Sequence, residues 1–177
     1  MELIAQADET GLAASGLACL DRCVPLFGDG VDEQALRPLW ANLADGTAWD
    51  GALAGVRRSL EPGGTGGTGD AGDAGDPAGA LARRMLAAVP AERTTGALRT
   101  WADGCSAAAL QIHRLLDATD DGVAPLVAAE LRRQIRVLEL LAGSTPGGGL
   151  RQVLDVSTEG RRVLRAVVSR RARTASG

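Results

Sequence analysis

The chain has 177 residues, a net charge of −3 and a hydrophobic fraction of 45%, with one Phe, three Trp and no Tyr. A chain this long can bury about 70% of the surface that its unfolded form exposes, so a core without metal or disulfide staples is expected. The small net charge gives no overall attraction to nucleic acid. No stretch approaches the roughly 18 uncharged apolar residues of a membrane span.

The apolar residues are mostly Ala, Leu and Val, and this choice favours helices. Ala and Leu are among the best helix formers, whereas sheet cores draw on β-branched and aromatic residues. Lys is absent, so all 19 basic residues are Arg. Together with abundant Ala, Gly and Asp, this composition indicates codon bias more than an Arg-specific function.

The first predicted helix covers residues 3–27 and is apolar on most sides. Its two stripes are Leu17, Leu20, Val24 and Phe27, and beside them Leu12, Gly16, Cys19, Cys23 and Leu26. Two stripes predict a helix that is surrounded by neighbours. Pro25 would kink or end it.

Two shorter helices are predicted at 33–44 and 48–60. Asp32 is a suitable N-cap for the first, although Pro38 inside it also allows two short turns. Thr47 is the expected cap of the second. The buried candidates are Leu36, Leu39, Trp40 and Leu43 in the first helix, and Trp49, Leu53, Val56 and Leu60 in the second.

Residues 61–79 form a Gly- and Asp-rich segment that cannot fill a core. Its Gly and Pro content opposes helix and strand alike, so we expect a long flexible, disordered loop. The repeated Gly-Asp-Ala pattern resembles a calcium loop only faintly. It is short and irregular and lacks a closing Glu, so a solvated linker is the favoured interpretation.

Four helices are predicted after the loop, at 81–89, 91–118, 125–143 and 150–172. Pro125 suits the first position of the third, and Gly143 suits its end. The expected buried stripes are Leu81, Met85, Leu86 and Val89; Leu98, Trp101, Cys105, Ala108 or Ala109, Ile112 and Leu116; Leu126 or Val127, Leu131, Ile135, Leu138 and Leu141; and Leu150, Val153 or Leu154, Ser157, Gly160, Leu164, Val167 and Val168.

The predicted fold class is all-α, an irregular antiparallel bundle of about five to seven helices, because short connections favour antiparallel neighbours. We expect residues 1–177 to form a single domain, with 61–79 as an internal flexible loop and 174–177 as a disordered tail. The helices before and after residues 61–79 all carry apolar faces that need a neighbour to bury them. The two halves of the chain should therefore pack together. The N-terminus has no signal-peptide pattern, which predicts a cytoplasmic protein.

Cys19, Cys23, Cys105 and His113 are the candidate metal ligands. Cys19 and Cys23 are one helical turn apart, and three thiolates with one imidazole could bind zinc if the two helices face each other. No compact zinc-finger spacing is present, however. All three Cys lie on apolar stripes, so burial as small apolar side chains is the favoured interpretation.

Catalytic groups are scarce, so we lean against an enzyme. His113 is the single histidine, and we expect it at the boundary of the core or on the surface. There is no nucleophile-elbow pattern, no repeated Glu-x-x-His motif for a di-iron site and, without Lys, no Walker A motif.

The last predicted helix carries a cluster of cations that could contact nucleic acid or an acidic partner. The cluster is Arg161, Arg162, Arg165, Arg170, Arg171 and Arg173. Cations near the end of a helix also complement its dipole, and they could pair with acidic residues in the first sixty positions. We favour such solvated or intramolecular roles over nucleic-acid binding.

The sequence therefore predicts a non-enzymatic cytoplasmic helical protein that acts through protein–protein contacts, in a regulatory or adaptor role. A homodimer is one form of this hypothesis, and no membrane partner is expected. The first alternative is a thiol-based metal-binding or redox-sensing bundle. The second is nucleic-acid binding through the Arg-rich C-terminal helix.

Overall fold

The computed structural model describes residues 8–28, 30–45, 48–60, 76–117, 124–143 and 149–175. These residues form seven α-helices, a single 3-10 turn and no strand, which confirms the predicted all-α class. The elements are α2 (Glu9–Arg22), η1 (Val24–Leu26), α3 (Arg37–Asp45), α4 (Trp49–Leu60), α6 (Pro77–Ala87), α7 (Thr95–Leu116), α8 (Pro125–Ala142) and α9 (Leu150–Ala175).

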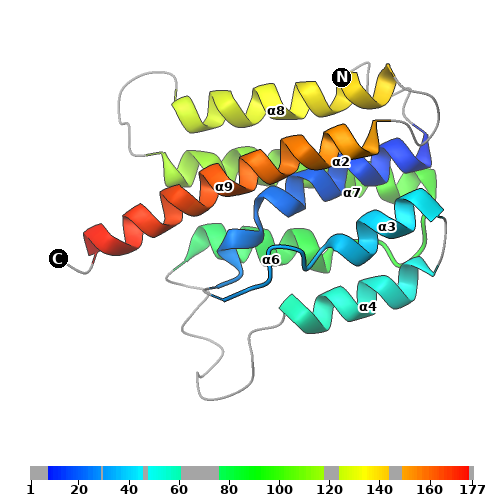
Figure 1. Cartoon of the computed structure of the whole chain (residues 1–177), viewed down its shortest axis with the longest axis horizontal. Helices are drawn as coiled ribbons and strands as arrows, with labels where there is room; N and C mark the ends of the chain where they lie inside the picture. The colour runs from blue at the N-terminus through cyan, green and yellow to red at the C-terminus, as the bar shows by residue number, and fades with distance from the viewer. Residues whose placement is uncertain are drawn as a thin grey trace.

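Helix α2 is the centre of the bundle (Figure 1). It packs against α7, α8 and α9, and these four helices make a bundle in which α7 also contacts α8 and α8 contacts α9. Helix α6 covers α7, while α3 pairs with α4 and touches α2. The helices on the two sides of residues 61–75 therefore share one set of contacts, as expected from their apolar faces.

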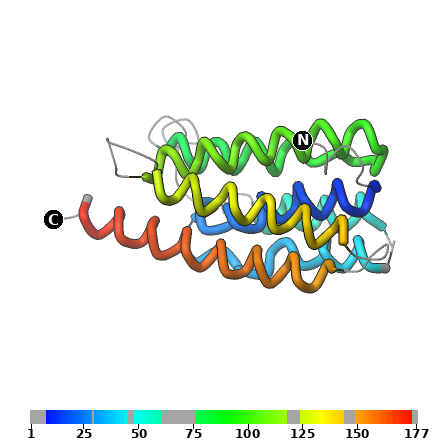
Figure 2. Tube along the Cα trace, turned by 90° about the horizontal axis from the view of Figure 1, so that it is seen from above, coloured from blue at the N-terminus to red at the C-terminus, as the bar shows by residue number. Residues whose placement is uncertain are grey.

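The last three helices run side by side with alternating direction, which confirms the predicted antiparallel arrangement. Figure 2 shows α7, α8 and α9 as neighbouring rods, and the colours of Figure 1 show α9 running opposite to α8. Consecutive helices with short connections pack in this way because a short connection returns the chain beside itself.

Several helix ends differ from the sequence prediction. Asp32 accepts a hydrogen bond from the Gln34 amide at 2.9 Å, but it begins a turn, and α3 starts only at Arg37. Pro38 then lies in the first turn of α3, where its missing N–H leaves no bond unmade. The Thr47 cap lies outside the described residues.

The predicted loop at 61–79 and the predicted tail at 174–177 each include residues that are helical in the structure. Asp76 caps α6 by accepting from the Gly79 amide at 3.0 Å, so residues 77–79 are helical. Helix α9 continues to Ala175, which makes residues 174 and 175 helical as well. Residues 61–75, and 176 and 177, lie outside the described part of the chain.

Most predicted stripes are buried, which confirms the helical spacing read from the sequence. Both stripes of α2 and η1 are buried, although Phe27 is only half-buried. The stripes of α3, α4 and α7 are buried throughout. Helix α2 is buried on most sides, which is consistent with its central position.

The stripe predicted for α8 is wrong in orientation. Leu131 and Ile135 were expected in the core, but they are 47% and 45% exposed. The residues of α8 that face inward are Glu130, Gln134 and Val137. Polar side chains therefore occupy most of the inner face of α8, and part of its apolar stripe is exposed to solvent.

Gly16 allows α2 and α7 to approach closely. A Cβ built on Gly16 would lie 2.6 Å from a ring carbon of Trp101. The Trp101 ring is held in place because its Nε1 donates to the Met85 carbonyl at 3.0 Å. The indole therefore cannot move away without losing a buried hydrogen bond.

We predict that Gly16→Ala lowers the free energy of unfolding by about 1–3 kcal/mol, because the added methyl overpacks the contact with Trp101. The matched control is Gly55→Ala on α4, where a Cβ meets nothing within 4 Å. That control should raise the free energy of unfolding by about 0.5–1 kcal/mol through helix propensity. Urea denaturation measures both, and equal effects of the two variants would contradict the close contact.

Candidate functional site

A buried ion pair joins α2 to α8. The Arg22 side chain is 1% exposed and that of Glu130 is fully buried. Nη2 of Arg22 lies 2.6 Å from Oε1 of Glu130, and Nε lies 2.9 Å from Oε2, so the contact is bidentate. Two opposite charges in this geometry offset part of the cost of removing each from water.

Polar side chains of α7 and α8 extend this ion pair. Gln134 donates from Nε2 to Oε1 of Glu130 at 3.0 Å and to the Ser106 carbonyl at 3.2 Å. Its Oε1 accepts from the Ser106 hydroxyl at 2.6 Å. Both ends of the Gln134 amide are therefore satisfied, and the network ties three helices together.

His113 completes the network, and its predicted place at the boundary or surface is wrong. It is 2% exposed, with Nδ1 2.8 Å from the Ala109 carbonyl and Nε2 3.7 Å from Oε2 of Glu130. A carbonyl can only accept, so Nδ1 carries the proton. Burial lowers the pKa of His113 despite the opposing effect of Glu130, because the charged imidazolium is poorly solvated there.

The charges in the network also shift the pKa values of Glu130 and Arg22. Burial alone would raise the pKa of Glu130, but the Arg22 guanidinium outweighs it and holds that pKa below its usual range. Burial likewise opposes the charged form of Arg22, yet Cys19 and Glu130 together raise its pKa. Glu130 and Arg22 are therefore both ionised near neutral pH, and His113 is neutral.

A second buried pair joins α2 to α9. Nη1 of Arg161 lies 2.9 Å from Oδ1 of Asp21. Burial raises the pKa of Asp21 to about 6, against the lowering effects of Arg161 and Arg22. Beside this pair, a Cβ on Gly160 would collide with the Arg22 side chain. The glycine of α9 therefore makes room for the arginine of α2.

A small cavity of about 20 Å³ lies between α2, α7 and α8. Its lining includes Ser15, Cys19, Arg22, Ser106 and Gln134. A space of this size holds about one water molecule where polar groups surround it. The cavity is too small for a substrate.

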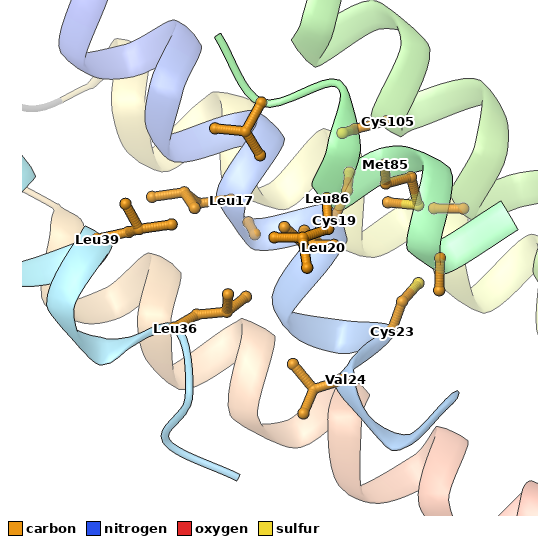
Figure 3. Packing of buried hydrophobic residues seen from close by; sticks show 14 of the residues in the cluster. Leu17, Cys19, Leu20, Cys23, Val24, Leu36, Leu39, Met85, Leu86 and Cys105 are labelled. Atoms are coloured by element: carbon orange, nitrogen blue, oxygen red, sulfur yellow. The ribbon is translucent and has the colours of Figure 1, made fainter. Parts of the chain in front are cut away.

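The three cysteines lie among the buried apolar residues of the core (Figure 3). Nη2 of Arg22 is 3.4 Å from Sγ of Cys19. Burial raises the pKa of Cys19 to about 11, with Arg22 opposing the shift, and it raises the pKa values of Cys23 and Cys105 well above their ordinary value. These thiols are therefore protonated near neutral pH, whereas reactive cysteines have a lowered pKa.

The predicted metal ligands are only partly brought together. Cys19 and Cys23 are near enough to Cys105 to help raise its pKa, whereas His113 is hydrogen-bonded to the Ala109 carbonyl and faces Glu130. In the part of the chain that the structure describes, no group of three or more His, Cys, Asp or Glu side chains is arranged to hold a metal ion. The zinc site stays a prediction.

The Arg cluster of α9 divides into engaged and exposed members. Arg161 is buried against Asp21, Arg165 pairs with Glu33, and Arg171 donates to the Leu115 carbonyl at 2.9 Å. Pairing with the acidic first sixty residues is thus seen for two of the six. Arg165 and Arg171 are exposed despite these contacts, as are Arg162, Arg170 and Arg173.

Sequence reasoning missed Arg22, Glu130 and Gln134. The signal was present: Asp21 and Arg22 interrupt a helix that is apolar on most sides, and Glu130 and Gln134 are one turn apart between apolar residues. Charged residues are almost never fully buried unless they are paired. A search for such pairs would have linked Arg22 to an acid, but the sequence does not say which one.

No protein-family model, curated protein or solved structure matches this chain. No helix in the described ranges is long and apolar enough to cross a membrane. Function is therefore inferred from the residues and geometry of the chain itself.

We predict that Glu130→Gln lowers the free energy of unfolding by about 3–5 kcal/mol, because Arg22 keeps its charge in the core without a counter-ion. The matched control is Glu139→Gln on the same helix. Glu139 pairs with Arg136 at 3.5 Å, but both side chains are more than half exposed, so its loss should cost at most about 0.5 kcal/mol. A similar small cost for both variants would rule out the buried ion pair.

The pKa shifts of His113 and Asp21 predict opposite effects on acid stability. The unfolded chain protonates His113 more readily than the folded protein, so stability falls as the pH drops below its ordinary value of 6.5. Asp21 binds its proton more tightly when folded, so it adds stability as the pH falls through about 6 towards 3.8. Denaturant titrations at several pH values should show a shallower acid loss in His113→Gln and a steeper one in Asp21→Asn. Unchanged profiles in both variants would refute these assignments.

Proposed function

We propose that this protein binds a partner protein through the outer face of α8, and that the partner contributes an acidic amphipathic helix. The surface is the α8 strip, defined as Val127, Leu131, Ile135 and Leu138. The observation that carries the proposal is the exposure of Leu131 and Ile135 one turn apart. Such a pair of large apolar side chains is the usual anchor of a helix that lies along another helix.

The spacing of the strip fits a helical partner. Its members recur at intervals of 4, 4 and 3 residues, which places them on one side of α8. Val127 and Leu138, at the two ends of the strip, are half-buried. The exposed part of the strip is therefore continuous with partly buried apolar side chains. Gln134 and Glu130 are bonded inside the bundle. Turning α8 to bury the strip would therefore break the buried network.

The surroundings of the strip favour an acidic partner. Arg132 is exposed on α8 and Arg114 on the neighbouring α7. Arg136 is exposed as well, although it pairs with Glu139. Helices α8 and α9 together hold ten Arg and four acidic residues. Charge of one sign around an apolar centre selects partners of the opposite sign and speeds their association. It also repels a second copy of the same face.

The other hypotheses have less support from the geometry. A redox role needs thiols of lowered pKa, but burial raises the pKa of all three. Nucleic-acid binding through α9 would have to use Arg162, Arg170 and Arg173, since Arg161 and Arg165 are paired within the chain.

The test uses two synthetic helical peptides that share one apolar face and differ only in flanking Glu or Lys residues. Fluorescence anisotropy should show that the Glu peptide binds at least about ten-fold more tightly than the Lys peptide. Binding should weaken when the salt concentration rises from about 0.05 to 0.5 M, because added salt screens exposed charges.

Leu131→Gln with Ile135→Gln should reduce the affinity for the Glu peptide by about ten-fold or more, since each buried leucine-sized side chain is worth about 1.5–3 kcal/mol. The matched control is Leu115→Gln, which alters an exposed leucine on α7. Light scattering provides the second measurement. Equal binding by the double variant would refute the proposal, and so would a dimer that the double variant converts to a monomer.

A further inference from the structure

A second surface is the α6–α7 groove. It is lined by Leu81, Arg84 and Met85 of α6, by Ala88 just after that helix, and by residues of α7. It encloses about 620 Å³, within the usual range of small-molecule sites. Helix α8 packs against another side of α7 through Ser106. The groove is therefore separate from the α8 strip.

The sequence of α7 leaves this groove open. Gly96, Thr100, Gly104 and Ala108 follow one another at four-residue intervals along its wall, so they share one side of the helix. A Cβ at Gly96 or Gly104 would meet nothing within 4 Å. At about 1.5 Å per residue, this wall is about 18 Å long, which suits an extended alkyl chain.

The floor of the groove is apolar and fixed. It is formed by Met85, Trp101 and Cys105, which are at most 4% exposed. The indole Nε1 of Trp101 donates to the Met85 carbonyl at 3.0 Å, so its polar atom is already bonded. Burial keeps the Cys105 thiol protonated. These three side chains offer a ligand apolar, polarisable contact and no charge.

Among the described residues, Arg84 is the single charged side chain in the lining. It is exposed, and within the described part of the chain its guanidinium makes no ion pair or hydrogen bond. Arg84 and Leu81 also line an adjoining hollow of about 350 Å³. A guanidinium at this position presents paired N–H donors that match a carboxylate or phosphate.

We propose that the α6–α7 groove binds an amphipathic anion. The alkyl chain lies on Met85, Trp101 and Cys105, and the carboxylate or phosphate head group pairs with Arg84. A neutral or cationic amphiphile of the same length lacks this pairing and binds more weakly.

Isothermal titration calorimetry with decanoate, decyl phosphate, decanol and decyltrimethylammonium tests the proposal below the micelle concentration of each. The two anions should bind saturably, and the tighter of them identifies the preferred head group. Decanol should bind about ten-fold more weakly, and the cation more weakly still. Absence of saturable anion binding, or equal affinity for decanol, would overturn the proposal.

Two variants separate the head-group and chain contacts. Arg84→Gln should lower anion affinity about ten-fold to the level of decanol, while Gly104→Leu should fill the groove and abolish binding of every probe. Matched controls are Arg58→Gln and Gly55→Leu on α4, which alter an exposed arginine and an open helical glycine. Anion binding that survives Gly104→Leu, or that is lost equally in the controls, would place the site elsewhere and reject the assignment.

Discussion

The bidentate contact between Arg22 and Glu130 sets the orientation of the helices around it. Removing two charges from water costs several kcal/mol each, and only close, well-bonded pairing offsets that cost. Glu130 therefore has to face α2, because any rotation of α8 that turns it away leaves Arg22 charged and unpaired in the core. The pair contributes little net stability compared with apolar packing, but it restricts the arrangements that the bundle can adopt.

The outer surface follows from this constraint. With Glu130 and Gln134 facing inward, Leu131 and Ile135 face solvent, and the same helix presents arginines beside them. Two glycines allow the helices to approach closely: Gly160 leaves space for Arg22, and Gly16 leaves space for Trp101. Trp101 in turn forms part of the floor of the α6–α7 groove. Both proposed binding surfaces thus depend on contacts buried beneath them.

The sequence was sufficient for the fold where burial follows hydrophobicity. Helical spacing located the helices and the buried stripes of α2, α4 and α7, because their apolar residues all face one core. It failed for α8, where the most apolar stripe is not the buried one, and for His113, which was expected at the boundary of the core or on the surface and is buried. The error for α8 arises because periodicity cannot show that an acid on one helix will meet an arginine more than one hundred residues away.

The candidate site was less predictable than the fold. Cys19, Cys23 and Cys105 were correctly expected on apolar stripes, but the sequence did not indicate that Arg22 contacts Cys19. The Arg cluster of α9 was visible in the sequence, whereas the partners of Arg161 and Arg165 depend on tertiary packing. Spacing within one helix identifies neighbours on that helix, and contacts between helices require the structure.

Thiol labelling of α8 tests most directly whether the ion pair, and not the apolar stripe, sets its orientation. The three native cysteines are buried and protonated, so they provide an unreactive background for a thiol reagent such as Ellman's. In the folded protein, Leu131→Cys should react as fast as an exposed thiol, and Val137→Cys should react only on unfolding. Protection of Leu131→Cys together with rapid labelling of Val137→Cys would contradict the account.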